Sequence, residues 1–195
     1  MLALFCAVLA WSGYRPHDTF TWFLEVMPAL LGLAIVAGLW NRFRFTDFIY
    51  WWITIHCIVL MVGGKYTYAE MPLFNWLRDE FGLARNYYDR LGHFMQGFVP
   101  ALISREVLLR LGVIARPRWL NPIIVAIVLA FSAFYEFVEW WVALATGESA
   151  TAFLGTQGDP WDTQWDMFMC TTGACLALLL LSRLHDRAMQ RSLKR

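Results

Sequence analysis

The sequence predicts an all-α integral membrane protein, a bundle of about six transmembrane helices that forms a single polytopic domain over residues 1–195. Of the 195 residues, 59% are hydrophobic and 17% aromatic, and the mean hydropathy is positive, whereas a soluble domain is closer to half apolar. Five apolar runs also reach the roughly 20 residues that a helix needs to cross a bilayer. They are residues 20–40, 46–65, 88–112, 119–145 and 163–183.

The remaining helix is predicted from the shorter apolar run at residues 1–11. This run lacks the basic start and the small-residue cleavage site that are typical of a signal peptide. We therefore interpret it as a first, short transmembrane helix, with a signal anchor as the alternative.

A short interfacial helix is predicted between the runs at 46–65 and 88–112. Pro72 stands where a helix begins favourably, and Gly82 where one ends. Apolar side chains between them, at Leu73, Phe74, Trp76, Leu77 and Phe81, would face the membrane surface. The alternative is a loop that is anchored only by its aromatic residues.

The basic residues predict the orientation, because Lys and Arg concentrate on the cytoplasmic side. One set of helix ends carries ten of them: Arg42, Arg44, Arg110, Arg116, Arg118, Arg183, Arg187, Arg191, Lys194 and Arg195. The other set carries four: Arg15, Lys65, Arg78 and Arg85. Both termini are therefore expected in the cytoplasm.

Charge and cysteine content exclude several functions. A net charge of +1 lacks the strong positive charge that is typical of nucleic-acid-binding proteins. The expected partners are membrane lipids. Cys6, Cys57, Cys170 and Cys175 all lie in apolar runs without CxxC spacing. Neither a disulfide scaffold nor a zinc or redox motif is expected from them.

Ionisable residues inside the predicted spans are the candidate functional site, since such groups are costly in a bilayer and usually face the interior of the bundle. Asp89 and His93 share a helix face, with Arg90 about 100° away. Glu136 and Glu139 lie one turn apart, as do Asp162 and Asp166. His56 is a weaker candidate. With the orientation above, all seven fall in the outer half of the bundle.

Simpler interpretations exist for parts of this set. In the segment QGDPWDTQWDM, Asp159 suits an N-cap, Pro160 the first helical position and Asp162 the third, where a carboxylate meets the positive end of the helix dipole. Asp89 and His93 could form a purely structural hydrogen bond. One of the two glutamates could be protonated and hydrogen-bonded to another helix.

Together these residues suit a divalent metal ion, zinc, manganese or iron. The first hypothesis is a metal-dependent enzyme that acts on a lipid or lipid-linked substrate near the outer leaflet. The second is a proton-coupled small-molecule transporter that uses the same carboxylates as a relay. The third is a non-enzymatic accessory protein. Arg105 and Glu106, deeper along the run at 88–112, are candidates for residues that orient the metal ligands or relay protons.

Three segments carry a family resemblance: YYDRLGHFMQGFVPALISRE, FSAFYEFVEWW and GDPWDTQWDM. In them the chain resembles the YjdF family of uncharacterised bacterial inner-membrane proteins, and the resemblance spans nearly the whole chain. It implies a small polytopic protein of the bacterial inner (plasma) membrane. It implies no activity and no catalytic residue.

Overall fold

The computed structural model describes residues 1–114, 117–147 and 151–192, and in this part of the chain every regular element is a helix. The α-helices are α1 Leu2–Gly13, α2 Thr19–Leu39, α3 Asp47–Lys65, α4 Pro72–Phe81, α5 Tyr88–Arg110, α6 Leu120–Thr146, α7 Thr151–Leu154 and α8 Asp162–Ser192, with a 3₁₀ turn at Pro117–Trp119. Three residues counted above for the orientation, Arg116, Lys194 and Arg195, lie outside the described ranges.

Four of these helices are long and apolar enough to cross a membrane: α2, α3, α6 and α8. The helix α1 is shorter, and α5 is not among the four. It contains polar and charged residues, among them Asp89, Arg90, Arg105 and Glu106. The helix α5 tolerates these polar side chains because it is largely enclosed by its neighbours, so that they face protein. Buried residues occur along its whole length, from Tyr88 to Glu106.

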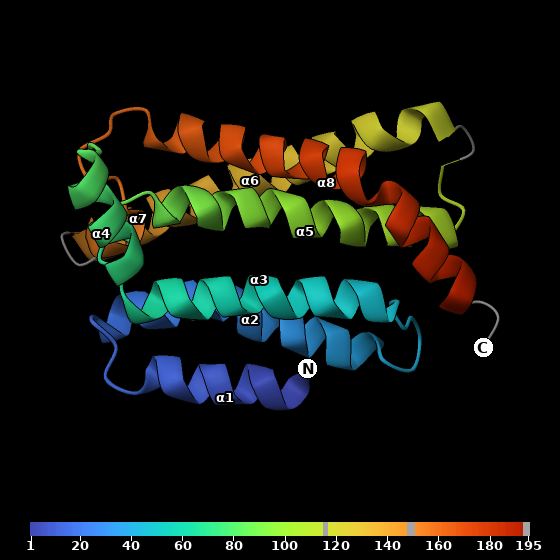
Figure 1. The fold of residues 1–195 in the computed structure, drawn as a ribbon, viewed down its shortest axis with the longest axis horizontal. Coiled ribbons are helices and arrows are strands. Elements are labelled where there is room, and N and C mark those ends of the chain that lie inside the picture. The colour runs from blue at the N-terminus through green and yellow to red at the C-terminus, as the bar shows by residue number, and fades with distance from the viewer. Residues whose placement is uncertain (115–116, 148–150, 193–195) are drawn as a thin grey trace.

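The helices form two groups that run side by side (Figure 1). One group contains α1, α2 and α3, and the other contains α5, α6 and α8, with α3 packed against α5. The short helices α4 and α7 lie at one end of the bundle, which we call the α4 end. The opposite end holds the start of α3 and the C-terminal turns of α5 and α8.

The predicted boundaries agree with the structure to within two residues, except at the end of α8. That helix continues to Ser192, whereas the apolar run ends at 183. The segment after 183 contains neither proline nor glycine, so nothing in it stops a helix that has already formed.

The helix α4 begins and ends as the sequence predicts. Pro72 occupies its first turn, and Gly82 follows it with a φ of 62°, in the left-handed region that glycine adopts without strain. Leu73, Trp76 and Phe81 are exposed. The loop alternative for this segment is therefore wrong.

Asp18 caps the N-terminus of α2, where its Oδ1 accepts a hydrogen bond of 2.7 Å from the backbone N–H of Thr21. This bond holds the pKa of Asp18 below its ordinary value of 3.8. A lowered pKa stabilises the fold fully above the ordinary value, and the stabilisation is lost as the pH falls through the folded-state pKa. We expect Asp18→Ala to reduce the free energy of unfolding by about 1 kcal/mol at neutral pH, measured by unfolding in detergent. Asp18→Asn keeps an acceptor oxygen and should lose less, and an equal loss in both variants would contradict a capping role.

Candidate functional site

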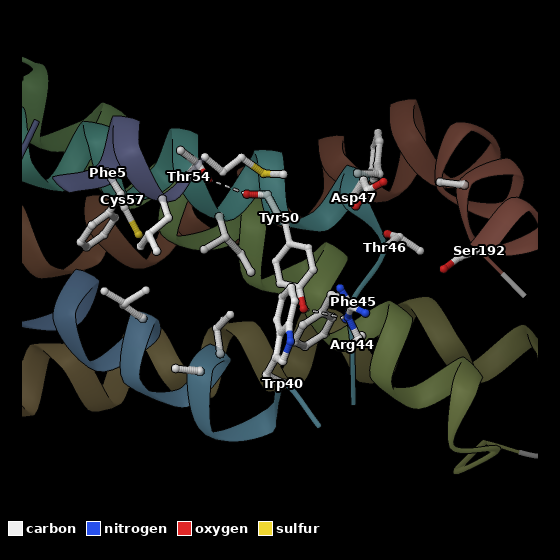
Figure 2. A pocket seen from close by; sticks show the side chains of 18 of the residues that line it. Phe5, Trp40, Arg44, Phe45, Thr46, Asp47, Tyr50, Thr54, Cys57 and Ser192 are labelled. Atoms are coloured by element: carbon white, nitrogen blue, oxygen red, sulfur yellow. Dashed lines mark hydrogen bonds between the residues drawn. The ribbon is translucent and has the colours of Figure 1, made fainter. Parts of the chain in front are cut away.

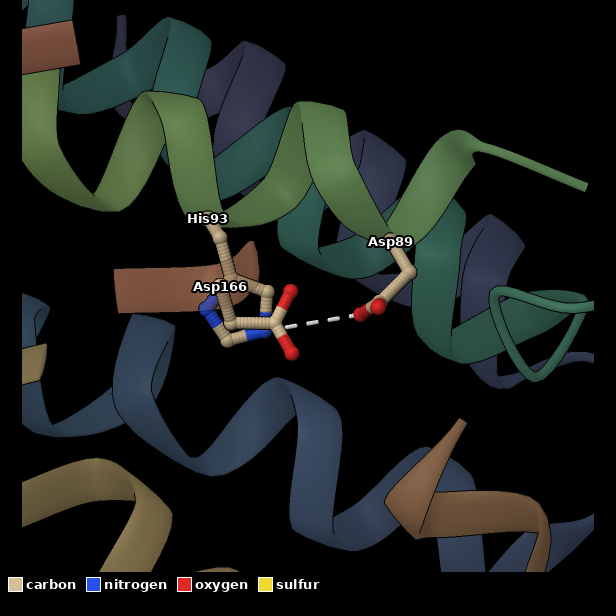
Figure 3. Close-up of side chains that lie close together, drawn as sticks. All are labelled: Asp89, His93 and Asp166. Carbon is tan, nitrogen blue, oxygen red and sulfur yellow. Dashed lines mark ion pairs between the residues drawn. The ribbon is translucent and has the colours of Figure 1, made fainter. Parts of the chain in front are cut away.

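Two acidic side chains converge on a histidine between α5 and α8 (Figure 3). The Nε2 atom of His93 lies 3.5 Å from Oδ1 of Asp89, one turn earlier on α5, and 3.6 Å from Oδ1 of Asp166 on α8. All three residues are buried. Both distances exceed the roughly 2.7–3.2 Å of an ordinary N–H···O hydrogen bond, so neither contact is a well-formed bond.

These separations match the spacing of donor atoms around a metal ion. Zinc binds nitrogen and oxygen at about 2.0–2.2 Å, which places neighbouring donors of a tetrahedral site roughly 3.3–3.6 Å apart. The donor atoms of Asp89, His93 and Asp166 all lie within 4.8 Å of one another. An ion between them would therefore need little rearrangement of the side chains.

His93 also belongs to a second group of donors, with Glu136 and Glu139 of α6, and these atoms again lie within 4.8 Å of one another. Two buried atoms in this group have no hydrogen-bond partner among the described residues, Nδ1 of His93 and Oε1 of Glu136. An imidazole can bind through either nitrogen, so one histidine links both groups. We call the five residues Asp89, His93, Glu136, Glu139 and Asp166 the acidic centre.

Two buried arginines neutralise part of this charge from the side of the α4 end. Arg90 forms ion pairs with Asp162 at 2.6 Å and with Asp166, and lies 3.4 Å from Asp89. Arg85, in the loop before α5, forms ion pairs with Asp162 at 2.5 Å and Asp89 at 3.3 Å. Although Arg90 leaves α5 about 100° away from Asp89, its long side chain reaches back into the cluster.

Two loops hold Arg85 in place. The side-chain amide of Gln157 and the backbone of Asn86 exchange a pair of hydrogen bonds of 2.9 and 3.0 Å. Arg85 donates to the carbonyl oxygens of Gly155 and Thr156 at 2.8 and 3.2 Å. The loop before α5 and the loop before α8 thus form one unit beside the acidic centre.

The charges do not balance among the buried side chains here. Five carboxylates are buried, those of Glu25, Asp89, Glu136, Asp162 and Asp166, against the guanidinium groups of Arg85 and Arg90 and the imidazole of His93. Burying unpaired charge is costly. Protons or a bound cation must compensate for the excess.

The predicted residues form two donor groups that share His93, and two predicted residues lie outside both groups. Asp89, His93 and Asp166 lie together, and His93, Glu136 and Glu139 lie together. Asp162 binds the two arginines and belongs to neither donor group. His56 on α3 has a buried Nε2 with no hydrogen-bond partner in the described part of the chain, and it also belongs to neither group.

Arg105 and Glu106 make other contacts, at the opposite end of the bundle. Arg105 pairs with Asp186 at 2.8 Å. Glu106 accepts hydrogen bonds from the hydroxyl of Thr46 at 2.7 Å and lies 2.9 Å from Nε2 of the fully buried His185. Arg105 and Glu106 lie roughly 20 Å along α5 from His93, so neither residue contacts the acidic centre.

The capping prediction needs a correction at Asp159. Its Oδ1 accepts a hydrogen bond from the backbone N–H of Trp161 at 2.9 Å, but α8 begins at Asp162. Asp162 therefore opens the helix instead of standing at its third position. Oδ2 of Asp159 lies 3.2 Å from Arg90, which links it to the arginine pair.

Three residues at or near the acidic centre and Glu106 could not be, or were not, selected from the sequence: Glu25, Arg85 and His185. Glu25 is an ionisable residue within the apolar run 20–40, the same signal that selected the others, and its carboxylate lies within electrostatic range of Asp89 and His93. Arg85 is counted above only among the basic residues at the helix ends, and His185 lies beyond the apolar run 163–183. For these two no local signal exists, because their partners Asp162 and Glu106 are 77 and 79 residues away in the chain.

In the described residues, an all-helical fold with four helices that are long and apolar enough to cross a membrane, and with a buried ionisable cluster, indicates a helical membrane protein. The chain belongs to the family described as "Predicted membrane protein (DUF2238)", whose model matches residues 1–187. A curated relative, "Inner membrane protein YjdF" of Escherichia coli (strain K12), is 46% identical over 185 residues, which are 94% of this chain and 88% of the relative. The resemblance predicted from the three segments is confirmed. No solved structure matches the chain.

Proposed function

We propose that the protein holds a divalent metal ion, zinc, manganese or iron, at the acidic centre. The observation that carries this proposal is the convergence of Asp89 and Asp166 on Nε2 of His93 at 3.5 and 3.6 Å, too long for good hydrogen bonds and suitable for a shared ion. Oε1 of Glu136, which no described residue hydrogen-bonds, offers a further ligand. A mixture of carboxylate and imidazole donors suits these three metals.

The proposed membrane placement puts α1, α2, α3, α5, α6 and α8 across the bilayer, with α4 in the interface and both termini in the cytoplasm. Support for α4 comes from its exposed Leu73, Trp76 and Phe81 and from its tie to the loop before α5, where Asn86 donates to Asn75 at 2.8 Å. The bias of basic residues towards the opposite end supports the orientation. The acidic centre would then lie near the outer leaflet of the inner membrane.

A metal ion there would favour an enzyme that acts on a lipid or lipid-linked substrate. Such an ion polarises a carbonyl or phosphoryl oxygen and makes bound water more acidic. Two donor groups share His93, so one carboxylate that does not bind the ion is available as a general base. A lipid-like substrate could approach laterally beneath α4.

The transporter alternative has less support. Along α5, the fully buried Val99 and Leu102 lie between His93 and Glu106, and they belong to the same apolar core as Ala174 of α8. A proton relay needs closely spaced polar groups or water. This apolar layer separates the two polar ends of the bundle.

Metal analysis of the purified protein tests the proposal. We expect one or two ions per chain by elemental mass spectrometry. We also expect His93→Ala and Glu136→Gln each to weaken binding at least about tenfold, since even indirect partners of a metal contribute that much. Asp79→Asn is the matched control, because Asp79 is an exposed carboxylate at the same end that pairs only with Arg78 among the described residues. Protein without a stoichiometric ion, before and after incubation with each metal, would contradict the metal site and favour the accessory hypothesis.

A further inference from the structure

A cavity of about 1160 Å³ opens at the opposite end of the bundle, away from the acidic centre. It lies between α1, α2 and α3 and extends to the last turns of α5 and α8 (Figure 2). Pockets for small molecules commonly measure about 300–1,000 Å³. The cavity is therefore large enough for a ligand of substantial size.

The lining changes from apolar to basic along the cavity. Phe5 and Cys57 stand at one side in Figure 2, and Arg44, Thr46 and Ser192 at the other. Between Asp47 and Cys57 the helix α3 advances roughly 15 Å. The cavity thus combines a deep hydrophobic part with a polar mouth near the end of the helices.

Three guanidinium groups line the polar part, those of Arg44, Arg110 and Arg191, against one carboxylate, that of Asp47, among the described residues. Arg110 pairs with Glu106 at 2.7 Å. No carboxylate oxygen in the described part of the chain lies within 4.0 Å of the guanidinium of Arg44 or Arg191, so neither forms an ion pair there. Both are exposed and can receive an anion.

Aromatic contacts fix two of the three arginines at this mouth. The guanidinium of Arg44 lies 4.1 Å from the ring centroid of Trp40, and that of Arg110 lies 4.2 Å from the ring centroid of Phe43. Arg110 also donates to the carbonyl oxygen of Arg44 at 2.5 Å. Stacking of this kind leaves the edge of a guanidinium, with its donors, open to an anion.

We propose that this cavity binds an anionic phospholipid from the surrounding bilayer. The phosphate of the headgroup would accept charge-assisted hydrogen bonds from Arg44 and Arg191, and an acyl chain would lie along α3 towards Phe5 and Cys57. Basic pockets between transmembrane helices are typical sites for anionic headgroups. The site is independent of the acidic centre and of any metal bound there.

Native mass spectrometry of the delipidated full chain in detergent tests the headgroup contact. We expect phosphatidylglycerol to bind more tightly than phosphatidylcholine with the same acyl chains. The double variant Arg44→Gln with Arg191→Gln should weaken phosphatidylglycerol binding about tenfold or more. The control is Arg42→Gln with Arg187→Gln, which removes the same charge from exposed residues at the same end that do not line the cavity, and it should change binding less than about twofold.

Ala37→Trp tests the apolar part, because Ala37 is an exposed small residue of α2 that lines the cavity. The larger side chain should reduce binding of both lipids. Equal loss in the two arginine double variants, or equal binding of the two lipids, would overturn the proposal. Competition by millimolar inorganic phosphate would also overturn it in favour of a free anion. If the double variant does not fold, Arg191→Gln alone, in the exposed last turn of α8, gives the same comparison with Arg187→Gln.

Discussion

Replacing Arg90 by glutamine should destabilise the folded protein by about 3–5 kcal/mol, the range expected when one partner of a buried ion pair is removed. Arg90 is buried and bonds Asp166 and Asp162, the latter at 2.6 Å. Without it, Asp162 would keep only the guanidinium of Arg85, and Asp166 would lose the one arginine that contacts it among the described residues. Chemical unfolding in detergent, with a chelator present to exclude any effect of metal, measures the loss.

The surface pair Arg78–Asp79 provides the control. Its two side chains are exposed by 35% and 67%, and solvent screens such a pair, so Arg78→Gln should change stability little. A double variant that adds Asp162→Asn to Arg90→Gln should recover part of the loss, because it removes a carboxylate that has lost its partner. If Arg90→Gln is no less stable than Arg78→Gln, the arginine does not hold the cluster together.

Arg90→Lys separates charge from geometry at the same position. Lysine keeps the positive charge but lacks the planar fork that reaches Asp162 and Asp166 at once. A stability between those of the parent and of Arg90→Gln would show that the fork contributes beyond the charge.

Helices and in-helix pairs could be predicted from the sequence because their signals are local. An apolar run fixes each span, Pro72 and Gly82 fix the ends of α4, and a spacing of four residues places Asp89 and His93 on one face of α5. The approach of Asp166 to His93 follows from the same logic, since costly polar residues in separate spans tend to face one interior.

The charge balance of the cluster could not be predicted in this way. Arg85 reaches Asp162 only because two loops pair through Asn86 and Gln157, and loop pairing leaves no periodic pattern in a sequence. His185 meets Glu106 because α8 continues beyond its apolar part. Glu25 is different, because it is an ionisable residue within the apolar run 20–40, the same local signal that distinguishes Glu136 and Asp166.

Gly97→Ala should destabilise the protein by about 2 kcal/mol or more, although alanine is the better helix former by about 1 kcal/mol. A Cβ at Gly97 of α5 would collide with the backbone carbonyl of Cys170 on α8, and one at Gly173 would collide with the carbonyl of Phe94 on α5. Backbone cannot give way as a flexible side chain can, so the two helices would have to move apart. These helices carry Asp89, His93 and Asp166, so the variant should also weaken metal binding.

Gly38→Ala is the matched control, since Gly38 lies within α2 and, among the described residues, no atom outside its own stretch of helix lies within 4 Å of the position that a Cβ would take. There the helix propensity acts alone, and we expect a gain of up to about 1 kcal/mol. Unfolding in detergent gives the stability of both variants, and elemental mass spectrometry gives their metal content. Equal stability in Gly97→Ala and Gly38→Ala would show that α5 and α8 tolerate a wider separation. Lost stability with undiminished metal content would show that the acidic centre does not depend on their close approach.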